Sequence, residues 1–139
     1  MSALCLNAAE RRRLDGFQNR CVRSIIGIKP AFISRISNVS VLQKARHHAA
    51  TLKLQKKQLQ MLGKILRSPS EHPLHQISFG LGLIPVTDRF VRRRGRPNKE
   101  LVPETWKQAI QWLGTSTRVK QLASDKNVWD ASSRSHFGF

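Results

Sequence analysis

Residues 49–67 read AATLKLQKKQLQMLGKILR and show the most regular helical period in the chain. Their apolar side chains share one helical face, which predicts an amphipathic helix packed on a core. These side chains are Leu52, Leu59, Leu62, Ile65 and Leu66. The other face carries Lys53, Lys57, Gln60, Lys64 and Arg67. No glutamate is interleaved for i,i+4 pairing, so contact with phosphates is favoured over a solvated lysine face, the simpler alternative.

Weaker helical signals precede and follow this stretch. Asn7 and Glu10 have the spacing of a capping box, and the helix that they begin is expected to end near Gly27, before Pro30. No β-hairpin signal occurs. Further short helices are expected from Asn38, over residues 74–79, from Pro103 to Gly114, and through Val119, Leu122 and Trp129.

The pattern predicts an all-α protein, a small irregular bundle of four to six helices with a basic connector containing Gly and Pro. The expected domains are a helical domain over residues 1–80, the basic connector over 81–100, a C-terminal helical extension over 101–130 and a frayed tail over 131–139.

Within the first helix, the spacing separates an apolar face from a basic one. The apolar face, expected to be buried, consists of Leu14, Phe17, Cys21, Ile25 and Ile28. The basic face, expected to contact phosphates, consists of Arg12, Arg13, Arg20 and Arg23.

The charge balance indicates the class of partner. The chain has 25 Lys and Arg against 8 Asp and Glu, a formal net charge of +17. The 55 residues between Asp15 and Glu71 contain no carboxylate, whereas a surface that serves only solubility mixes both signs. Such a field attracts polyanions, so nucleic acid is the expected partner. An anionic membrane surface or an acidic protein are the alternatives.

The sequence favours an intracellular protein. No run of about 18 apolar residues could cross a bilayer, and the first residues lack the pattern of a secretory signal. Cys5 and Cys21 are the only cysteines and are expected to be reduced thiols.

No catalytic or metal-binding constellation is recognisable. Two-metal phosphoryl transfer needs clustered carboxylates, and the eight acids here are scattered without an adjacent Asp pair. The pairs His47-His48 and His72/His75 have no Cys-x-x-Cys to complete a zinc site. We therefore expect no catalytic residue, no metal and no cofactor.

Residues 92–100 read RRRGRPNKE, and two interpretations are open. Arg-Gly-Arg-Pro is the core of a hook that enters the minor groove of A·T-rich DNA, where inserted arginine is favoured. The same residues suit a basic connector that touches a nucleic-acid backbone, which we prefer because charge alone explains it. The candidate contacts in this segment are Arg92, Arg93, Arg94, Arg96 and Lys99.

Five segments occur in an order that resembles the C-terminal region of non-LTR retrotransposon (LINE-like) reverse transcriptases. They are RRRLDGFQNRCVRSIIGI (11–28), ISNVSVLQKA (36–45), KKQLQMLGKILRSP (56–69), RRRGRPNKELV (92–102) and LASDKNVW (122–129). The likeness covers about residues 10–130. Three positions depart from the family pattern: Met61 and Leu101 stand where the family has Trp, and Lys64 stands where it has His.

The resemblance implies a thumb and post-thumb helical region that grips a template–primer duplex of RNA, DNA or a hybrid, in an element that works in the nucleus. The paired aspartates of the palm are absent, so the resemblance implies a fragment without polymerase activity that has the palm domain as a possible partner. Two other functions stay open: a stand-alone minor-groove binder, and a structural fragment that needs that palm.

Overall fold

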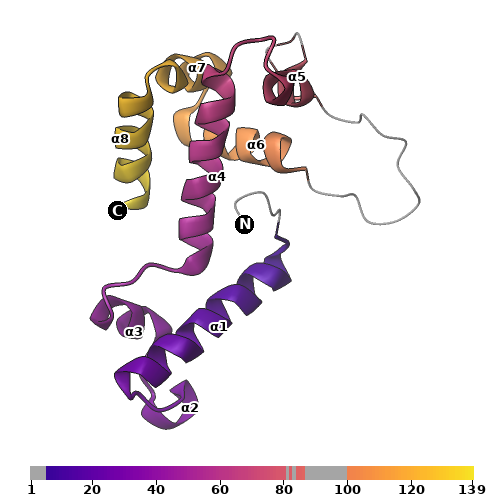
Figure 1. Cartoon of the computed structure of the whole chain (residues 1–139). Helices are drawn as coiled ribbons and strands as arrows, with labels where there is room; N and C mark the ends of the chain where they lie inside the picture. The colour runs from indigo at the N-terminus through magenta and orange to yellow at the C-terminus, as the bar shows by residue number, and fades with distance from the viewer. Residues whose placement is uncertain (1–5, 81, 83, 87–99) are drawn as a thin grey trace, which may run out of the picture. The chain divides into compact units, whose positions relative to one another are not determined.

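The computed structural model describes residues 6–80, 82, 84–86 and 100–139, which form eight helices and no strand (Figure 1). The predicted all-α helical bundle is confirmed. In chain order the helices are α1 (Ala8–Ile26), α2 (Ala31–Ser34), α3 (Asn38–Lys44), α4 (Ala50–Arg67), α5 (Pro73–Phe79), α6 (Leu101–Leu113), α7 (Ser116–Ser124) and α8 (Lys126–Phe137).

The described chain forms two compact units, and the boundary between them falls inside α4. We call Leu6–Gln55 the N-terminal unit and Lys56–Phe139 the C-terminal unit. The sequence placed a domain boundary after residue 80 instead. The difference arises because Phe79 of α5 packs its ring against Trp106 of α6, with centroids 5.5 Å apart, which joins α5 to the C-terminal unit.

The N-terminal unit begins with the expected capping box. Asn7 Oδ1 accepts from the Glu10 amide at 2.9 Å, and Glu10 Oε2 accepts from the Asn7 amide at 2.7 Å. Gly27 ends α1 in the left-handed region at φ 73°, which favours a residue without a Cβ. Val41 of α3 is fully buried, and α3 packs on α1.

The C-terminal unit is built on the apolar face of α4. Leu59, Leu62 and Ile65 are each at most 3% exposed, as the period of 49–67 predicted. Trp106 of α6, Val119 of α7 and Trp129 of α8 belong to the same core. Trp129 is fully buried, and its indole nitrogen donates to the Leu59 carbonyl at 3.1 Å. A buried indole is stable because that N–H finds an acceptor.

Two more helices are present than expected. The four-residue α2 is too short to leave a periodic pattern. The last predicted helix is divided into α7 and α8 because the Asp125 carboxylate accepts from the amides of Asn127 and Val128 and starts a new helix.

The end of the chain is helical instead of frayed. Helix α8 continues to Phe137, and Ser133 within it is fully buried. The Trp112 ring lies 4.8 Å from the His136 ring, and Phe137 packs against the core. The sequence predicts a frayed tail over 131–139, because the small and polar side chains there give no apolar period that would indicate these contacts.

Two mid-helix glycines provide a test of this packing. A Cβ added at Gly63 would lie 2.5 Å from the Trp129 indole nitrogen, whereas one at Gly16 meets nothing within 4 Å. We expect Gly63→Ala to lower the free energy of unfolding by about 1–3 kcal/mol through overpacking. Gly16→Ala should raise it by about 0.5–1 kcal/mol, the ordinary helix preference for Ala. Urea denaturation followed by circular dichroism measures both, and equal stabilisation by the two variants would contradict the Trp129 contact.

Candidate nucleic-acid interface

Three arginines on α1 are exposed as expected, namely Arg12, Arg13 and Arg20. They belong to a unit with ten Lys and Arg side chains and only two carboxylates, Glu10 and Asp15. Both carboxylates are engaged inside the unit. Glu10 closes the capping box, and Asp15 accepts from the Thr51 amide at 3.1 Å and from the Thr51 hydroxyl at 2.8 Å. Among the described residues, neither carboxylate therefore forms an ion pair with Arg12, Arg13 or Arg20.

Side chains of α1 hold the first turn of α4 within the N-terminal unit. Gln18 Oε1 accepts from the Ala50 amide at 2.6 Å, and Gln18 Nε2 donates to the His48 carbonyl at 2.9 Å. Together with Asp15 they satisfy backbone N–H groups at a helix start, where a negative charge is favourable. These contacts fix which sides of α1 face the rest of the unit.

Arg23 is not available for phosphate contact, which corrects its place among the predicted site residues. It is 5% exposed and makes five hydrogen bonds inside the unit. Its acceptors are the carbonyls of Lys29 and Ile36, the Ser34 hydroxyl and Asn38 Oδ1. The chain between Ile26 and Asn38 presents carbonyl groups that need donors, and the planar guanidinium supplies them.

The predicted burial of the apolar face of α1 is wrong for two residues, and the other three, Leu14, Cys21 and Ile28, are only half-buried. Phe17 is 61% exposed and Ile25 is 84% exposed. The residues of α1 that are buried are Asn19, Val22 and Arg23, on another side of the helix. Polar contacts to residues 29–38 and 48–51 decide the orientation of α1, and apolar periodicity does not report such contacts.

On α4, the predicted basic residues fall into two groups. Lys57 and Lys64 are exposed and lie seven residues, or two helical turns, apart. Lys53 is half-buried, with its ammonium 3.3 Å from His47 Nδ1, and the half-buried Arg67 donates to the Ala123 carbonyl at 3.0 Å. Arg67 thus joins α4 to the end of α7, and Lys57 and Lys64 are the more accessible pair.

The remaining predicted contacts lie outside the described residues. These are Arg92, Arg93, Arg94, Arg96 and Lys99, with the whole Arg-Gly-Arg-Pro segment.

The N-terminal unit also has exposed basic residues that the sequence reasoning did not select. They are Lys29, Arg35, Lys44 and Arg46. The long stretch without carboxylates was the signal that could have selected them.

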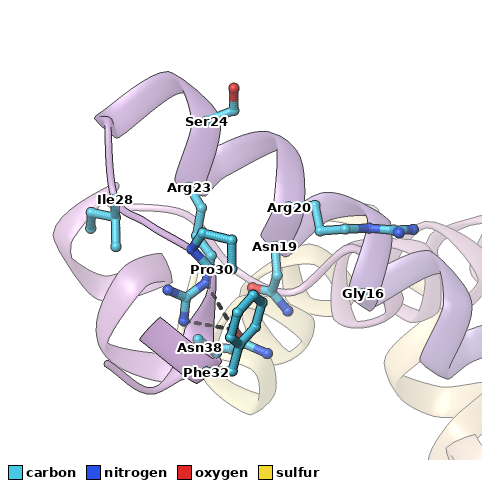
Figure 2. A pocket seen from close by; sticks show the side chains of 10 residues that line it. Gly16, Asn19, Arg20, Arg23, Ser24, Ile28, Pro30, Phe32 and Asn38 are labelled. Carbon is cyan, nitrogen blue, oxygen red and sulfur yellow. Dashed lines mark hydrogen bonds between the residues drawn. The ribbon is translucent and has the colours of Figure 1, made fainter. Parts of the chain in front are cut away.

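Sequence reasoning also missed a pocket of about 600 Å³ in the N-terminal unit (Figure 2). It is lined by residues of α1, by Ile28 and Pro30, and by the starts of α2 and α3. Two of these residues, Asn19 and Phe32, are not among the predicted site residues. Only the path of the chain after Gly27 brings them together.

Other chemistry is sparse in the part of the chain that the structure describes. No three His, Cys, Asp or Glu side chains gather there as metal ligands would. Cys21 is a free thiol, and Cys5 lies outside the described residues. Partial burial lowers the pKa of the Lys120 ammonium on α7. None of the described helices is long and apolar enough to span a bilayer.

Comparison with known proteins finds no match: no protein-family model, no curated protein and no solved structure is similar to this chain.

The Arg23 contacts predict a stability effect confined to one of two neighbouring arginines. Arg23→Ala leaves the carbonyls of Lys29 and Ile36 without this donor and removes all five hydrogen bonds of a buried side chain, so the N-terminal unit should lose about 2–3 kcal/mol of unfolding free energy. Arg20→Ala, the matched exposed control on the same helix, should change it by less than about 0.5 kcal/mol. Amide hydrogen exchange over residues 28–45 measures the difference, and slow exchange in both variants would argue against the Arg23 network.

Proposed function

We propose that this protein is a nucleic-acid-binding helical module that contacts the phosphates of a duplex and has no catalytic role of its own. The observation that carries the proposal is the state of the charges in the N-terminal unit. Arg12, Arg13 and Arg20 are exposed, while both carboxylates of that unit are bonded to its own backbone and side chains. Like charges that share one helix repel one another unless an anion neutralises them, and the phosphates of a duplex supply a dense array of negative charge.

The spacing of the exposed charges suits a regular polyanion. Arg13 and Arg20 on α1 are seven residues apart, as are Lys57 and Lys64 on α4. Seven residues span about 10 Å along a helix, so each pair can reach separate phosphates from one helical face. Phosphate contacts carry no base information, so this mode of binding accepts RNA, DNA or a hybrid.

The resemblance of five ordered segments to non-LTR retrotransposon reverse transcriptases supports a narrower form of the proposal. In that form the duplex is a template–primer, the module acts behind a polymerase active site, and the palm domain is a partner. This narrower form rests on the sequence motifs. The basic segment at residues 92–99 contributes to it as a connector that touches the backbone, with the minor-groove hook as the alternative.

Salt dependence tests the proposal. Affinity for a blunt duplex should fall steeply with salt, and the log–log slope should be roughly −0.9 for each neutralised phosphate. Replacing Arg12, Arg13 and Arg20 together by Ala should make the slope less negative by roughly one for each contact that is lost. Fluorescence anisotropy across a salt series measures the slope.

A matched control removes three charges elsewhere. Lys107, Arg118 and Lys126 are exposed in the C-terminal unit and belong to neither basic face. Their joint replacement by Ala lowers the net charge equally and should change the slope far less. An equal effect of the two triple variants, or a flat salt dependence of the unaltered chain, would refute specific contact by α1.

A second candidate function is docking to another protein, such as the polymerase palm, and the exposed apolar side chains of the N-terminal unit favour it. Phe17, Ile25 and Val39 are 61%, 84% and 66% exposed. If these residues serve a protein partner, Phe17→Ser with Ile25→Ser should leave duplex affinity within about twofold, since they carry no charge. The same change should abolish palm binding in a pull-down with a purified reverse-transcriptase palm domain. Loss of duplex affinity instead would assign this face to nucleic acid.

A further inference from the structure

The pocket of the N-terminal unit combines apolar walls with a few polar groups, the usual composition of a small-ligand site (Figure 2). Ile28, Pro30 and Phe32 supply the apolar walls. Asn19 and Arg20 of α1 supply polar groups, and the buried Arg23 lies beside them. No acidic side chain lines it.

Asn19 is the first sign that the pocket accepts a polar ligand. The residue is 8% exposed, and its Oδ1 atom is buried without a hydrogen-bond partner. Buried side-chain oxygens in native proteins nearly always accept a hydrogen bond. An amide group offers one acceptor and two donors, so it can pair with a ligand that carries both kinds of group on one edge.

Arg23 is the second sign, because its charge is buried without a counter-ion. All five of its hydrogen bonds go to neutral oxygen atoms, although buried charges in proteins are usually paired. Arg20 adds an exposed guanidinium to the same pocket. The pocket therefore attracts a ligand that carries negative charge.

Phe32 indicates the shape of that ligand. Its ring belongs to the pocket, yet the residue is 82% exposed, so a face of the ring is open to a stacking partner. Stacking of bases on aromatic rings is the usual way in which proteins hold unpaired nucleotides. A ligand that is flat, has donors and acceptors on its edge and bears a phosphate is a nucleotide.

We propose that this pocket holds an unpaired nucleotide next to the duplex, with its base stacked on Phe32, its edge hydrogen-bonded to the Asn19 amide and its phosphate at Arg20. The inference rests on the proposed function and adds to it a preference for a duplex that carries a single-stranded overhang. An apolar peptide side chain would use the walls of the pocket and leave the amide and the charges unsatisfied.

The test compares two probes on the full chain: a blunt duplex, and the same duplex with a short overhang that contains 2-aminopurine. The unaltered protein should bind the overhang probe more tightly and quench the 2-aminopurine fluorescence through stacking. Phe32→Ala should reduce affinity for the overhang probe about five- to a hundredfold, with little effect on the blunt duplex. Phe32→Tyr keeps the ring and should keep both the affinity and the quenching.

Ile33→Ala is the matched control, because Ile33 is an exposed apolar residue of the same helix α2 that lies outside the pocket lining. It should leave both probes unaffected. Equal binding of the overhang probe by Phe32→Ala and the unaltered chain, or an equal loss in Ile33→Ala, would overturn the inference while blunt-duplex binding still supports the proposed function. If the overhang alone is bound and the blunt duplex is not, the pocket stands and duplex binding through phosphates fails.

Discussion

The guanidinium of Arg23 organises the N-terminal unit. Arg23 lies in the last turn of α1, and its guanidinium donates to the backbone carbonyls of Lys29 and Ile36 and to the side chains of Ser34 and Asn38. Carbonyl groups outside regular helix need other donors, and a planar group with five donors suits that need. With residues 29–38 held against α1, Pro30 and Phe32 come to lie beside Asn19, and the pocket exists as a consequence.

The same hydrogen bonds explain why α1 exposes apolar side chains that its helical period predicts to be buried. Asp15 and Gln18 form hydrogen bonds with the first turn of α4, and Arg23 forms them with residues 29–38. The side of α1 that carries them faces the unit, so Phe17 and Ile25 face outward. A protein of this size obtains only a modest core from apolar burial, and hydrogen bonds to backbone groups can outweigh one apolar stripe in setting a helix orientation.

In the C-terminal unit, apolar packing decides how the helices are arranged, whereas polar contacts do so in the N-terminal unit. The Trp129 ring packs directly against the backbone of α4, because Gly63 has no side chain that would separate them. Its indole nitrogen bonds to the Leu59 carbonyl, and Trp112 contacts it edge to face at 5.9 Å. The proposed contacts with nucleic acid are thus placed on two different kinds of scaffold: α1 is held by polar contacts, and the second half of α4 is held by a packed aromatic core.

The sequence by itself determined the two longest helices, α1 and α4, and the sign of the charge. The period of 49–67, the Asn7–Glu10 capping box and Gly27 predicted α4 and both ends of α1, because these signals act within one helix. The exposure of Arg12, Arg13, Arg20, Lys57 and Lys64 was predicted in the same way.

Only the tertiary structure decided that Arg23 is buried, that Phe17 and Ile25 are exposed, and that residues 131–137 are helical. Each of these depends on partners distant in sequence, such as the Ile36 carbonyl for Arg23 and the Trp112 ring for His136, and no local period records which atoms a fold brings together.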